Sequence, residues 1–462
     1  MTDASTAAPP APGAWSPRMW GLLIVLAGNM LIDALEVSVM VVAVPSVGAD
    51  LRLTPVAAQW TLTGFAVGFG GLMLFAGRVV SLLGRRRVYL WALFGFAAAS
   101  LVAGLAGDPA TLLATRFVKG FCAALTAPTG LAIIGATFRA GPDRDRAVSV
   151  YTLFGGCGFT AGLVLSGLLT EAGWRWTMVF PAPVVLVLLV FGQRLIPEDD
   201  GSGGRPRVTR RQLDVAGALT LTGGLLALVL AVVTVTERGR ADAWTLGVAL
   251  AALALLAAFC LAERRARHPL VPAALLRDGP LVRSALGAAS LNGSFLGLLL
   301  VLTYQWQTAQ GWGPLRTGLA LLPASAPLAL TALSSGRMVR RFGTSRLIVL
   351  GATAPLIGYV LYLRDPAHAT YTTGVLPTLL LVGAGFVLAF AALNTQAVAG
   401  VAPTERGPAV ATYQTAVQTG AVLVIAPTAA LLTSHGSRTA MALVTAVGAV
   451  GLLAALRPLR RS

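Results

Sequence analysis

The chain has 462 residues, of which 56% are hydrophobic and 11% are charged, and its net charge is +17. Soluble domains carry about 25% charged residues, so a soluble protein of this composition would expose more apolar surface than it could cover. The basic residues gather in loops on one side of the predicted helices, so their excess indicates membrane topology rather than nucleic-acid binding.

Fourteen apolar stretches follow one another along the chain, with short polar connectors between them. A bilayer core roughly 30 Å thick needs about 20 apolar residues in a helix. Only helices that satisfy their own backbone hydrogen bonds can fill such stretches in lipid. The predicted helices span 19–46, 57–80, 88–106, 110–138, 147–170, 175–195, 213–236, 244–262, 284–308, 315–336, 346–363, 373–400, 408–432 and 437–457.

The basic residues predict the orientation of these helices. An even number of spans puts both termini on one side, and most of the 35 Lys and Arg residues fall in the loops of that side. The positive-inside rule therefore places both termini in the cytoplasm. Arg-rich, Lys-poor composition is typical of a GC-rich bacterium, so we expect a multi-pass protein of a bacterial cytoplasmic (inner) membrane. Residues 1–18 predict a disordered cytoplasmic tail rather than a signal peptide.

A short repeat predicts the architecture. Residues 77–87 read GRVVSLLGRRR and residues 336–346 read GRMVRRFGTSR, and each copy joins the cytoplasmic ends of two predicted helices. The offset between the copies corresponds to about eight helices, whereas two six-helix halves in direct tandem would give six. Two extra helices, near 213–236 and 244–262, must therefore lie between the halves.

The predicted fold is an all-α polytopic membrane protein with two six-helix bundles and two extra helices between them. The predicted domains are the tail at 1–18, the N-terminal bundle at 19–195, a cytoplasmic linker with the extra helices at 196–262, and the C-terminal bundle at 263–462. Six-helix repeats of this kind are a transporter architecture, with the substrate site between the halves near the midplane of the bilayer.

The sequence resembles the major facilitator superfamily, and within it the exporters of the fourteen-helix drug:proton antiporter group. Residues 77–87 resemble the family signature between helices 2 and 3. Residues 116–128 (RFVKGFCAALTAP) resemble the helix-4 signature, and residues 35–45 (LEVSVMVVAVP) the helix-1 signature. Residues 173–176 (GWRW) and 307–323 (QTAQGWGPLRTGLALLP) resemble further stretches of this group. The resemblance covers essentially the whole chain.

Three positions depart from the family pattern. Ser81 stands where the loop signature carries an acid, and Lys119 stands where helix 4 usually has Gln. Residues 162–167 (GLVLSG) lack the Pro and one Gly of the helix-5 antiporter signature, which removes the basis for the kink expected in that helix. In the family the missing loop acid pairs across the halves and steadies the outward-open state. The two access states are therefore expected to lie closer in free energy here.

Four ionisable residues lie at bilayer depth, where they cost several kcal/mol unless they face a cavity or one another. Asp33 and Glu36 are three residues apart in helix 1, and Arg116 and Lys119 repeat that spacing in helix 4, so each pair shares one helix face. The resemblance implies that helices 1 and 4 line the cavity of the first half, so the pairs should meet. These four are the predicted proton-coupling residues, with Glu36 carrying the proton and Asp33 in a lesser role. The alternative is a static charge network that joins the two helices.

Uncharged residues supply the predicted substrate cavity and the predicted gate. The substrate-cavity residues are Gln307, Trp306, Asn292, Asn394 and Gln418. For most such polar residues, hydrogen bonding between helices is the alternative. The gating-loop residues are Gly77, Ser81, Gly84, Arg85, Arg86, Gly336 and Gly343. We expect Gly77 and Gly84 to form a tight turn, the arginines to meet helix C-termini, and Ser81 to cap a helix.

The predicted function is a proton-coupled antiporter that exports a hydrophobic small molecule, such as a drug, an antibiotic or a secondary metabolite, by alternating access. An uptake permease is the alternative within the same fold, and a non-transporting membrane sensor or assembly protein is a more distant one. The sequence contains no nucleotide-binding loop, no catalytic constellation and no metal-ligand spacing. We therefore expect no enzyme activity and no cofactor. The expected partners are the substrate, protons and lipid, and the protein is expected to work as a monomer.

Overall fold

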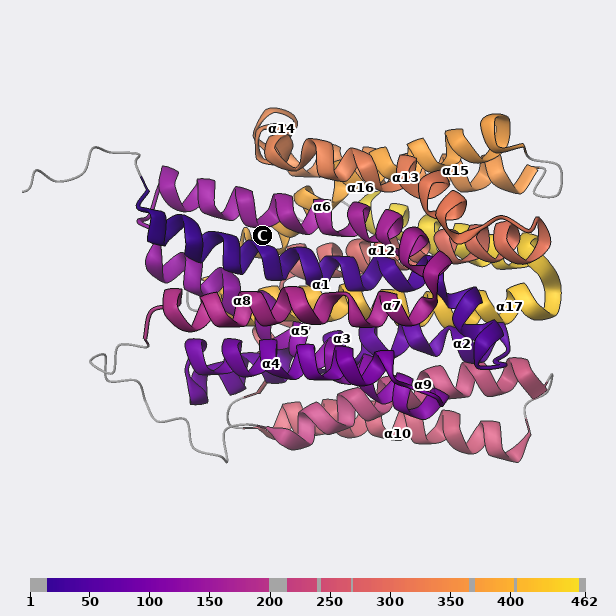
Figure 1. Ribbon diagram of the computed structural model, residues 1–462, viewed down its shortest axis with the longest axis horizontal. Helices are drawn as coiled ribbons and strands as arrows, with labels where there is room; N and C mark the ends of the chain where they lie inside the picture. Colours follow the sequence, from indigo (N-terminus) through magenta and orange to yellow (C-terminus); the bar gives the residue numbers. More distant parts are fainter. Residues whose placement is uncertain are drawn as a thin grey trace, which may run out of the picture.

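The structure is a computed structural model that describes residues 15–198, 214–238, 242–266, 269–364, 370–402 and 405–456. Within these ranges every regular element is a helix, and the long helices lie side by side along the long axis of the molecule (Figure 1). We call the end of the bundle where the first helix begins the N-terminal face, and the end where that helix finishes the opposite face. Residues 1–14 of the predicted tail and most of the predicted linker fall outside the described residues, and α1 begins at Pro17, within the predicted tail.

The helices of the first half begin and end close to the predicted bounds. They are α1 (Pro17–Asp50), α2 (Pro55–Ala58), α3 (Trp60–Leu83), α4 (Arg85–Gly104), α5 (Pro109–Thr137), α6 (Pro142–Ala172), α7 (Trp174–Val179) and α8 (Pro181–Leu195). Several start with Pro in the first turn, where its missing N–H costs nothing. Before α5, the side chain of Asp108 accepts a hydrogen bond from the backbone N–H of Thr111 and so caps the helix.

The remaining helices form the extra pair and the second half. The extra pair is α9 (Val215–Arg238) and α10 (Ala243–Arg265). The second half contains α11 (Ala273–Arg277), α12 (Gly279–Tyr304), α13 (Pro314–Thr331), α14 (Ser335–Phe342), α15 (Thr344–Arg364), α16 (Leu376–Val398) and α17 (Arg406–Leu456). Three short segments, η2 (Gln305–Ala309), η3 (Ala332–Ser334) and η4 (Tyr371–Val375), adjoin these helices; η2 and η4 are π-helical.

The number of membrane crossings depends on how two elements are divided. In the described residues, 12 helices are long and apolar enough to cross a membrane, or 13 if the bent pair Pro314–Ala320 and Leu322–Phe342 is one span. The longest helix, α17, contains Gly436 in a non-helical conformation. Gly420 and Gly451 of α17 both pack against one turn of α12, at Ala289 and Ser290, so the chain turns back at Gly436. The predicted number of fourteen crossings is reached only if the bent pair counts as one span and α17 is divided into two spans at Gly436.

The two halves meet along several helix pairs. Within the first half α1 packs on α6, and α3 and α4 pack on α5; within the second, α12 packs on α17 and α15 on α16. Between the halves, α6 contacts α13, α3 contacts α17, and α1 contacts α12. The extra helices α9 and α10 pack on each other, and α9 also contacts α3 and α17 (Figure 1). The extra pair therefore lies beside the junction of α3 and α17.

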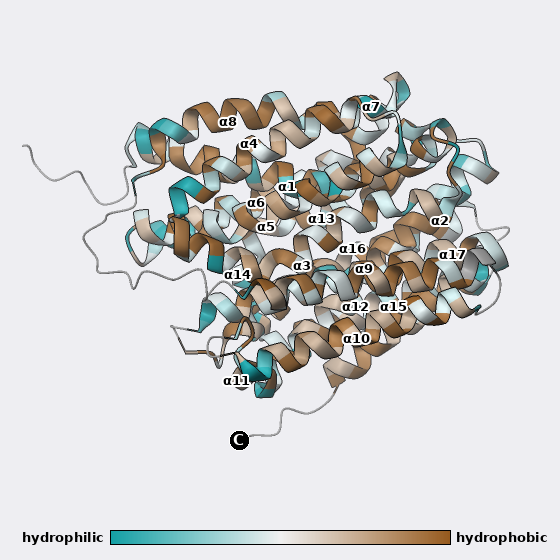
Figure 2. Cartoon of the chain, turned by 90° about the horizontal axis from the view of Figure 1, so that it is seen from below, coloured by the Kyte–Doolittle hydropathy of each residue, from teal (hydrophilic) through white to brown (hydrophobic). Residues whose placement is uncertain are grey.

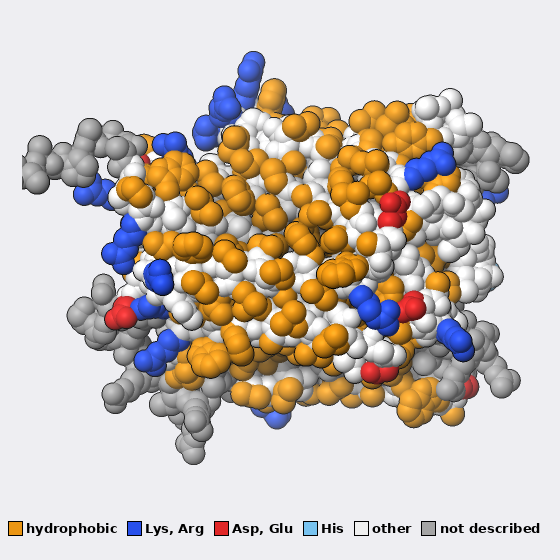
Figure 3. Space-filling view, in the orientation of Figure 1, with side chains coloured by type: hydrophobic (Ala, Val, Ile, Leu, Met, Phe, Trp, Pro, Cys, Tyr) orange, Lys and Arg blue, Asp and Glu red, His pale blue; other side chains and the backbone are white. Residues whose placement is uncertain are grey.

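The outer surface has the polarity of a membrane protein. Large apolar side chains are exposed along the helices, for example Leu250 and Leu253 of α10 at 65% and 62%. Figure 2 shows hydrophobic residues along the outer helices α8 and α10 and hydrophilic residues toward the two ends of the bundle. In Figure 3 an apolar band covers the middle of the visible face, and basic side chains gather mainly at the end where the chain begins. The molecule is a multi-pass membrane protein.

The turns at the N-terminal face correct two sequence-based predictions. Gly84 and Gly343 adopt positive φ angles of 90° and 78° and form the turns, which glycine does without steric cost. Gly77 and Gly336, by contrast, lie within α3 and α14, so the expectation that Gly77 forms the turn is wrong. Ser81 also lies within α3, where its hydroxyl donates to the carbonyl of Arg78 at 2.8 Å, so it does not cap a helix as predicted.

Candidate functional site

Glycines let the two helices that carry the charged residues, α1 and α5, pack closely on their neighbours. Gly158 of α6 lies against the backbone of α1, because a Cβ placed there would be 2.3 Å from the carbonyl oxygen of Leu31. Gly120 of α5 lies against α3 in the same way, because a Cβ placed at Gly120 would be 2.2 Å from the carbonyl oxygen of Phe65. Small residues at such contacts allow helix backbones to approach closely. α1 is thus packed closely on α6, and α5 on α3.

Glu36 of α1 is held between two cations of α5. Its Oε1 accepts from Lys119 Nζ at 2.6 Å, and its Oε2 forms an ion pair with Arg116 Nη1. Arg116 is fixed further by donating from Nε to the carbonyl of Thr61 at 2.8 Å and from Nη2 to the carbonyl of Glu36 at 3.2 Å. The three charged side chains are fully buried. The predicted meeting of Glu36 with Arg116 and Lys119 therefore occurs in the structure.

Aromatic rings complete the surroundings of the two cations. The guanidinium of Arg116 lies 4.9 Å from the ring centroid of Phe65, and Lys119 Nζ lies 5.0 Å from that of Phe96. Cations at such distances are attracted by the faces of aromatic rings. Because water is excluded, the carboxylate and the cations depend on one another for stabilisation. Protonation of Glu36 would release both cations at once, which makes this cluster suitable as a switch.

Asp33 has different partners from those that the sequence predicted. Its Oδ2 accepts hydrogen bonds from Asn29 Nδ2 and Thr126 Oγ1, both at 2.9 Å, and its Oδ1 has no hydrogen-bond partner. The side chain is 3% exposed. In the part of the chain that the structure describes, no cation forms an ion pair with it. The expectation that both acids of α1 meet the cations of α5 is therefore wrong for Asp33.

Two of the predicted substrate-cavity residues lie at the opposite face, on η2. Gln307 Nε2 donates to the carbonyl of Val42 in α1 at 3.0 Å, so it joins the two halves. Trp306 is 2% exposed and stacks on Trp312, with ring centroids 4.9 Å apart. Both side chains are thus engaged with protein groups in this conformation. Their contact with a substrate stays a prediction.

The other three predicted cavity residues lie on helices of the second half. Asn292 of α12 donates to the carbonyl of Val417 in α17 at 3.1 Å, which is a hydrogen bond between helices. Asn394 donates to the carbonyl of Phe390 in its own helix, α16, at 2.9 Å. Gln418 is 8% exposed and packs against Gly70 of α3, at the junction of the two halves. Contact of these residues with a substrate also stays a prediction.

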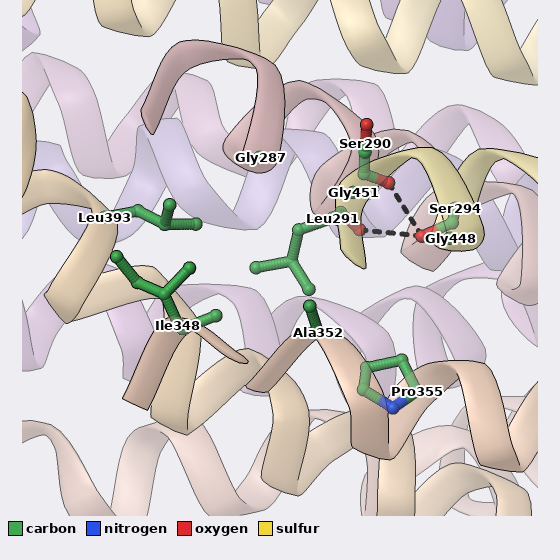
Figure 4. A pocket seen from close by; sticks show the side chains of 11 residues that line it. Gly287, Ser290, Leu291, Ser294, Ile348, Ala352, Pro355, Leu393, Gly448 and Gly451 are labelled. Carbon is green, nitrogen blue, oxygen red and sulfur yellow. Dashed lines mark hydrogen bonds between the residues drawn. The ribbon is translucent and has the colours of Figure 1, made fainter. Parts of the chain in front are cut away.

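A small pocket lies within the second half, between α12, α15, α16 and α17. Its volume is about 20 Å³, and Figure 4 shows Leu291, Ile348 and Leu393 pointing into it. Ser294 beside it donates to the carbonyls of Ser290 and Leu291. A space of this size holds about one water molecule. It is therefore too small to be the site for a drug-sized ligand.

The arginines of the predicted gating loop meet helix C-termini, as expected. Arg86 forms an ion pair with Glu198 at 2.6 Å and donates to the carbonyl of Gln193 in the last turn of α8, also at 2.6 Å. Arg85 donates to the carbonyl of Ala132, near the end of α5, at 3.4 Å. The contact with Gln193 satisfies a carbonyl of the kind that a helix leaves without a partner in its last turn, whereas Ala132 lies five residues before the end of α5. The contacts with Gln193 and Ala132 lie within the first half, and Glu198 follows it directly in the sequence.

Sequence reasoning missed three residues that position the charged groups. Asn29 and Thr126 hold Asp33, and the backbone carbonyl of Thr61 holds Arg116. Asn29 could have been found, because it lies four residues before Asp33 and therefore on the same helix face. Thr126 and Thr61 come from other helices, and their roles depend on how α3 and α5 pack.

Comparison with known proteins identifies relatives over most of the chain. The family model described as the Major Facilitator Superfamily matches residues 26–425. A puromycin resistance protein of Streptomyces alboniger is 36% identical over 433 residues, which are 91% of this chain and 84% of that protein. A lincomycin resistance protein of Streptomyces lincolnensis is 32% identical over 398 residues, covering 84% of this chain and 80% of that one. A cephamycin export protein of Amycolatopsis lactamdurans is 32% identical over 409 residues, covering 87% and 82%.

Solved structures show the same fold at low sequence identity. The xylose transporter from E. coli, in a partially occluded inward-open conformation, matches with a TM-score of 0.65 and 16% identity, over 97% of this chain and 99% of that chain. A POT family transporter in complex with 5-aminolevulinic acid matches with a TM-score of 0.69 and 13% identity, over 95% of each chain. These similarities establish the arrangement of the helices.

Proposed function

The chain belongs to the major facilitator superfamily, as its motifs predicted, and we propose that it is a proton-coupled antiporter that exports an antibiotic or a related hydrophobic small molecule. Three relatives that align with most of the chain carry names of resistance to, or export of, puromycin, lincomycin and cephamycin. They differ in their named compounds, so they support a class of cargo rather than one compound.

The observation that carries the coupling proposal is Glu36 between Arg116 and Lys119. An ionised Glu36 is stabilised by both cations, whereas a protonated Glu36 leaves them without a counter-ion in a buried site. The two protonation states therefore favour different arrangements of α1, which carries the acid, and α5, which carries the cations. Because α1 also contacts α12 of the other half, such a change can bias which face of the transporter is open.

Drug susceptibility and vesicle transport test this function. Expressed in a bacterium that lacks its own drug exporters, the protein should raise the inhibitory concentration of at least one of puromycin, lincomycin and a cephamycin. Membrane vesicles turned inside out should accumulate that drug only when a proton gradient is present. Glu171→Gln is the matched control, because Glu171 lies exposed at the end of α6 and forms none of the ion pairs found among the described residues. Accumulation by right-side-out cells would favour the uptake permease, and transport that ignores the proton gradient would contradict the coupling.

We further propose that the N-terminal face is cytoplasmic and that the protein lies in the bacterial cytoplasmic membrane as a monomer. In this proposal the bundles at 19–195 and 263–462 move relative to each other, and the basic loops of the N-terminal face remain inside. The loops that carry Gly84 and Gly343, together with Arg85 and Arg86, would then form the cytoplasmic gate.

Cysteine labelling tests this orientation. Gly407→Cys lies on the N-terminal face and Gly107→Cys on the opposite face, and a Cβ at either position meets no other atom within 4 Å. Both changes belong in a chain whose native Cys122, Cys157 and Cys260 have been replaced by Ala. A membrane-impermeant thiol reagent added to intact cells should label Gly107→Cys alone. Labelling of Gly407→Cys from outside would reverse the orientation.

A further inference from the structure

Two carboxyl groups lie three residues apart on α1, and their surroundings differ in charge. Glu36 has two cations within ion-pair distance. Asp33 has hydrogen bonds from Asn29 and Thr126 on one oxygen and no partner on the other. A buried carboxylate without a counter-ion is far more costly than one held by two cations. The geometry is thus that of one ionised acid beside one neutral acid.

The other ionisable groups near Asp33 do not supply a counter-ion. Those close enough to interact with it electrostatically are Glu36 of its own helix, Cys122 of α5, Tyr89 of α4 and Tyr151 of α6. Tyr151 donates its hydroxyl to the carbonyl of Ala127 at 3.0 Å. The hydroxyl of Tyr89 is buried and has no hydrogen-bond partner in the ranges that the structure describes. None of these groups is a cation, and Arg116 and Lys119 are both bound to Glu36.

We propose that Asp33 is a second proton-carrying group, which receives the proton from Glu36 and passes it toward the N-terminal face. This inference rests on the proposed function and adds a step to it. The proton leaves the carboxyl of Glu36, which becomes the carboxylate bound by Arg116 and Lys119, and it binds the carboxylate of Asp33, which becomes neutral. The net charge of the four residues is unchanged by this transfer. In the structure Glu36 is bound by both cations, so this conformation corresponds to the state in which the proton has already moved to Asp33.

The positions of the residues give this transfer a direction. Asp33 precedes Glu36 by three residues, so it lies about 4.5 Å nearer the N-terminal face along α1. Thr126, which holds Asp33, likewise lies nearer that face than Lys119, because α5 runs from the opposite face to the N-terminal face. An exporter driven by inward proton flow must release protons on the cytoplasmic side, which is the N-terminal face in this proposal. Asp33 lies between that face and Glu36 with its two cations. Its position gives it a larger role than the sequence alone predicted.

Infrared difference spectroscopy of the purified protein tests the protonation state without any substrate. The spectrum of the wild type minus that of Asp33→Asn at neutral pH should contain the carbonyl band of a protonated carboxyl. The wild type minus Glu36→Gln should contain a carboxylate band instead. Asp33→Glu should restore the protonated band, and Thr126→Val, which keeps the acid, should shift it. A carboxylate band in the Asp33→Asn difference would overturn the proposal.

Transport by proteoliposomes tests the relay itself, with puromycin as the probe and a pH-sensitive dye inside. Asp33→Asn should slow puromycin-driven proton movement at least tenfold, whereas exchange of labelled for unlabelled puromycin, which needs no net proton movement, should continue. If Asp33→Asn slowed proton movement and puromycin exchange equally, or slowed neither of them, Asp33 would not be a proton relay. If wild-type liposomes move puromycin without protons, the proposed coupling fails, and the infrared result still decides whether Asp33 carries a proton.

Discussion

Replacement of Glu36 by Gln is expected to abolish proton-driven export while the protein still reaches the membrane. Gln has nearly the same shape as Glu but cannot bind and release a proton, and it leaves Arg116 and Lys119 without their carboxylate. Drug accumulation by inside-out vesicles should fall to the level of vesicles without the protein. Exchange of labelled for unlabelled drug, which requires no net proton movement, should be reduced less than driven transport.

Two variants distinguish a coupling role of Glu36 from a purely structural one. Glu36→Asp keeps an ionisable acid and should retain part of the driven transport, with a changed dependence on pH. Glu171→Gln removes an exposed acid at the end of α6 that belongs to none of the ion pairs among the described residues, and it should behave as the wild type. Wild-type transport by Glu36→Gln, with an unchanged dependence on pH, would show that the assignment of Glu36 is wrong.

Arg116→Ala is expected to lose transport and to lower the stability of the protein. The change removes an ion pair with Glu36, a hydrogen bond to the carbonyl of Thr61 and the contact with the ring of Phe65. Breaking a buried ion pair by removing one partner costs on the order of 3–5 kcal/mol. The thermal unfolding midpoint of the purified protein in detergent should therefore fall clearly. Arg116→Lys should unfold at a higher temperature than Arg116→Ala, because it keeps the charge but not the planar fork.

Combined replacements test whether the charged cluster serves only to join the helices. Glu36→Gln with Arg116→Gln still leaves Lys119 buried without a carboxylate, so this double variant should remain less stable than the wild type. Adding Lys119→Gln removes the last charge and should recover most of the stability, but not proton-driven transport. Normal coupled transport by the triple variant would mean that the cluster is only structural.

The sequence predicted the meeting of Glu36 with Arg116 and Lys119 for a general physical reason. Charges inside a bilayer must find one another or water, and few charged residues lie within the predicted spans. The partners of Asp33 could not be predicted in the same way. Which acid of α1 faces the cations depends on the rotation and depth of α1 against α5. These follow from the packing of the whole bundle, which includes the close contacts of Gly158 with α1 and of Gly120 with α3.

The apolar stretches predicted the long helices, but local geometry decided the details. The repeat predicted turns at the N-terminal face, yet among its glycines at 77, 84, 336 and 343 only Gly84 and Gly343 have positive φ angles, whereas Gly77 continues α3. The role expected for Trp306 as a ligand surface also depends on local geometry. The π-helical segment η2 carries it, and it is buried against Trp312. Such segments depart from the ordinary helical period, so a pattern of period 3.6 does not reveal them.

Proton movement coupled to drug movement in proteoliposomes tests the central claim most directly. Liposomes that contain the purified protein, puromycin and a pH-sensitive dye are diluted into puromycin-free buffer at equal pH. As puromycin leaves, the interior should become more acidic with the wild type, and it should keep its pH with Glu36→Gln. Release of puromycin by the wild type without any change of internal pH would contradict proton coupling.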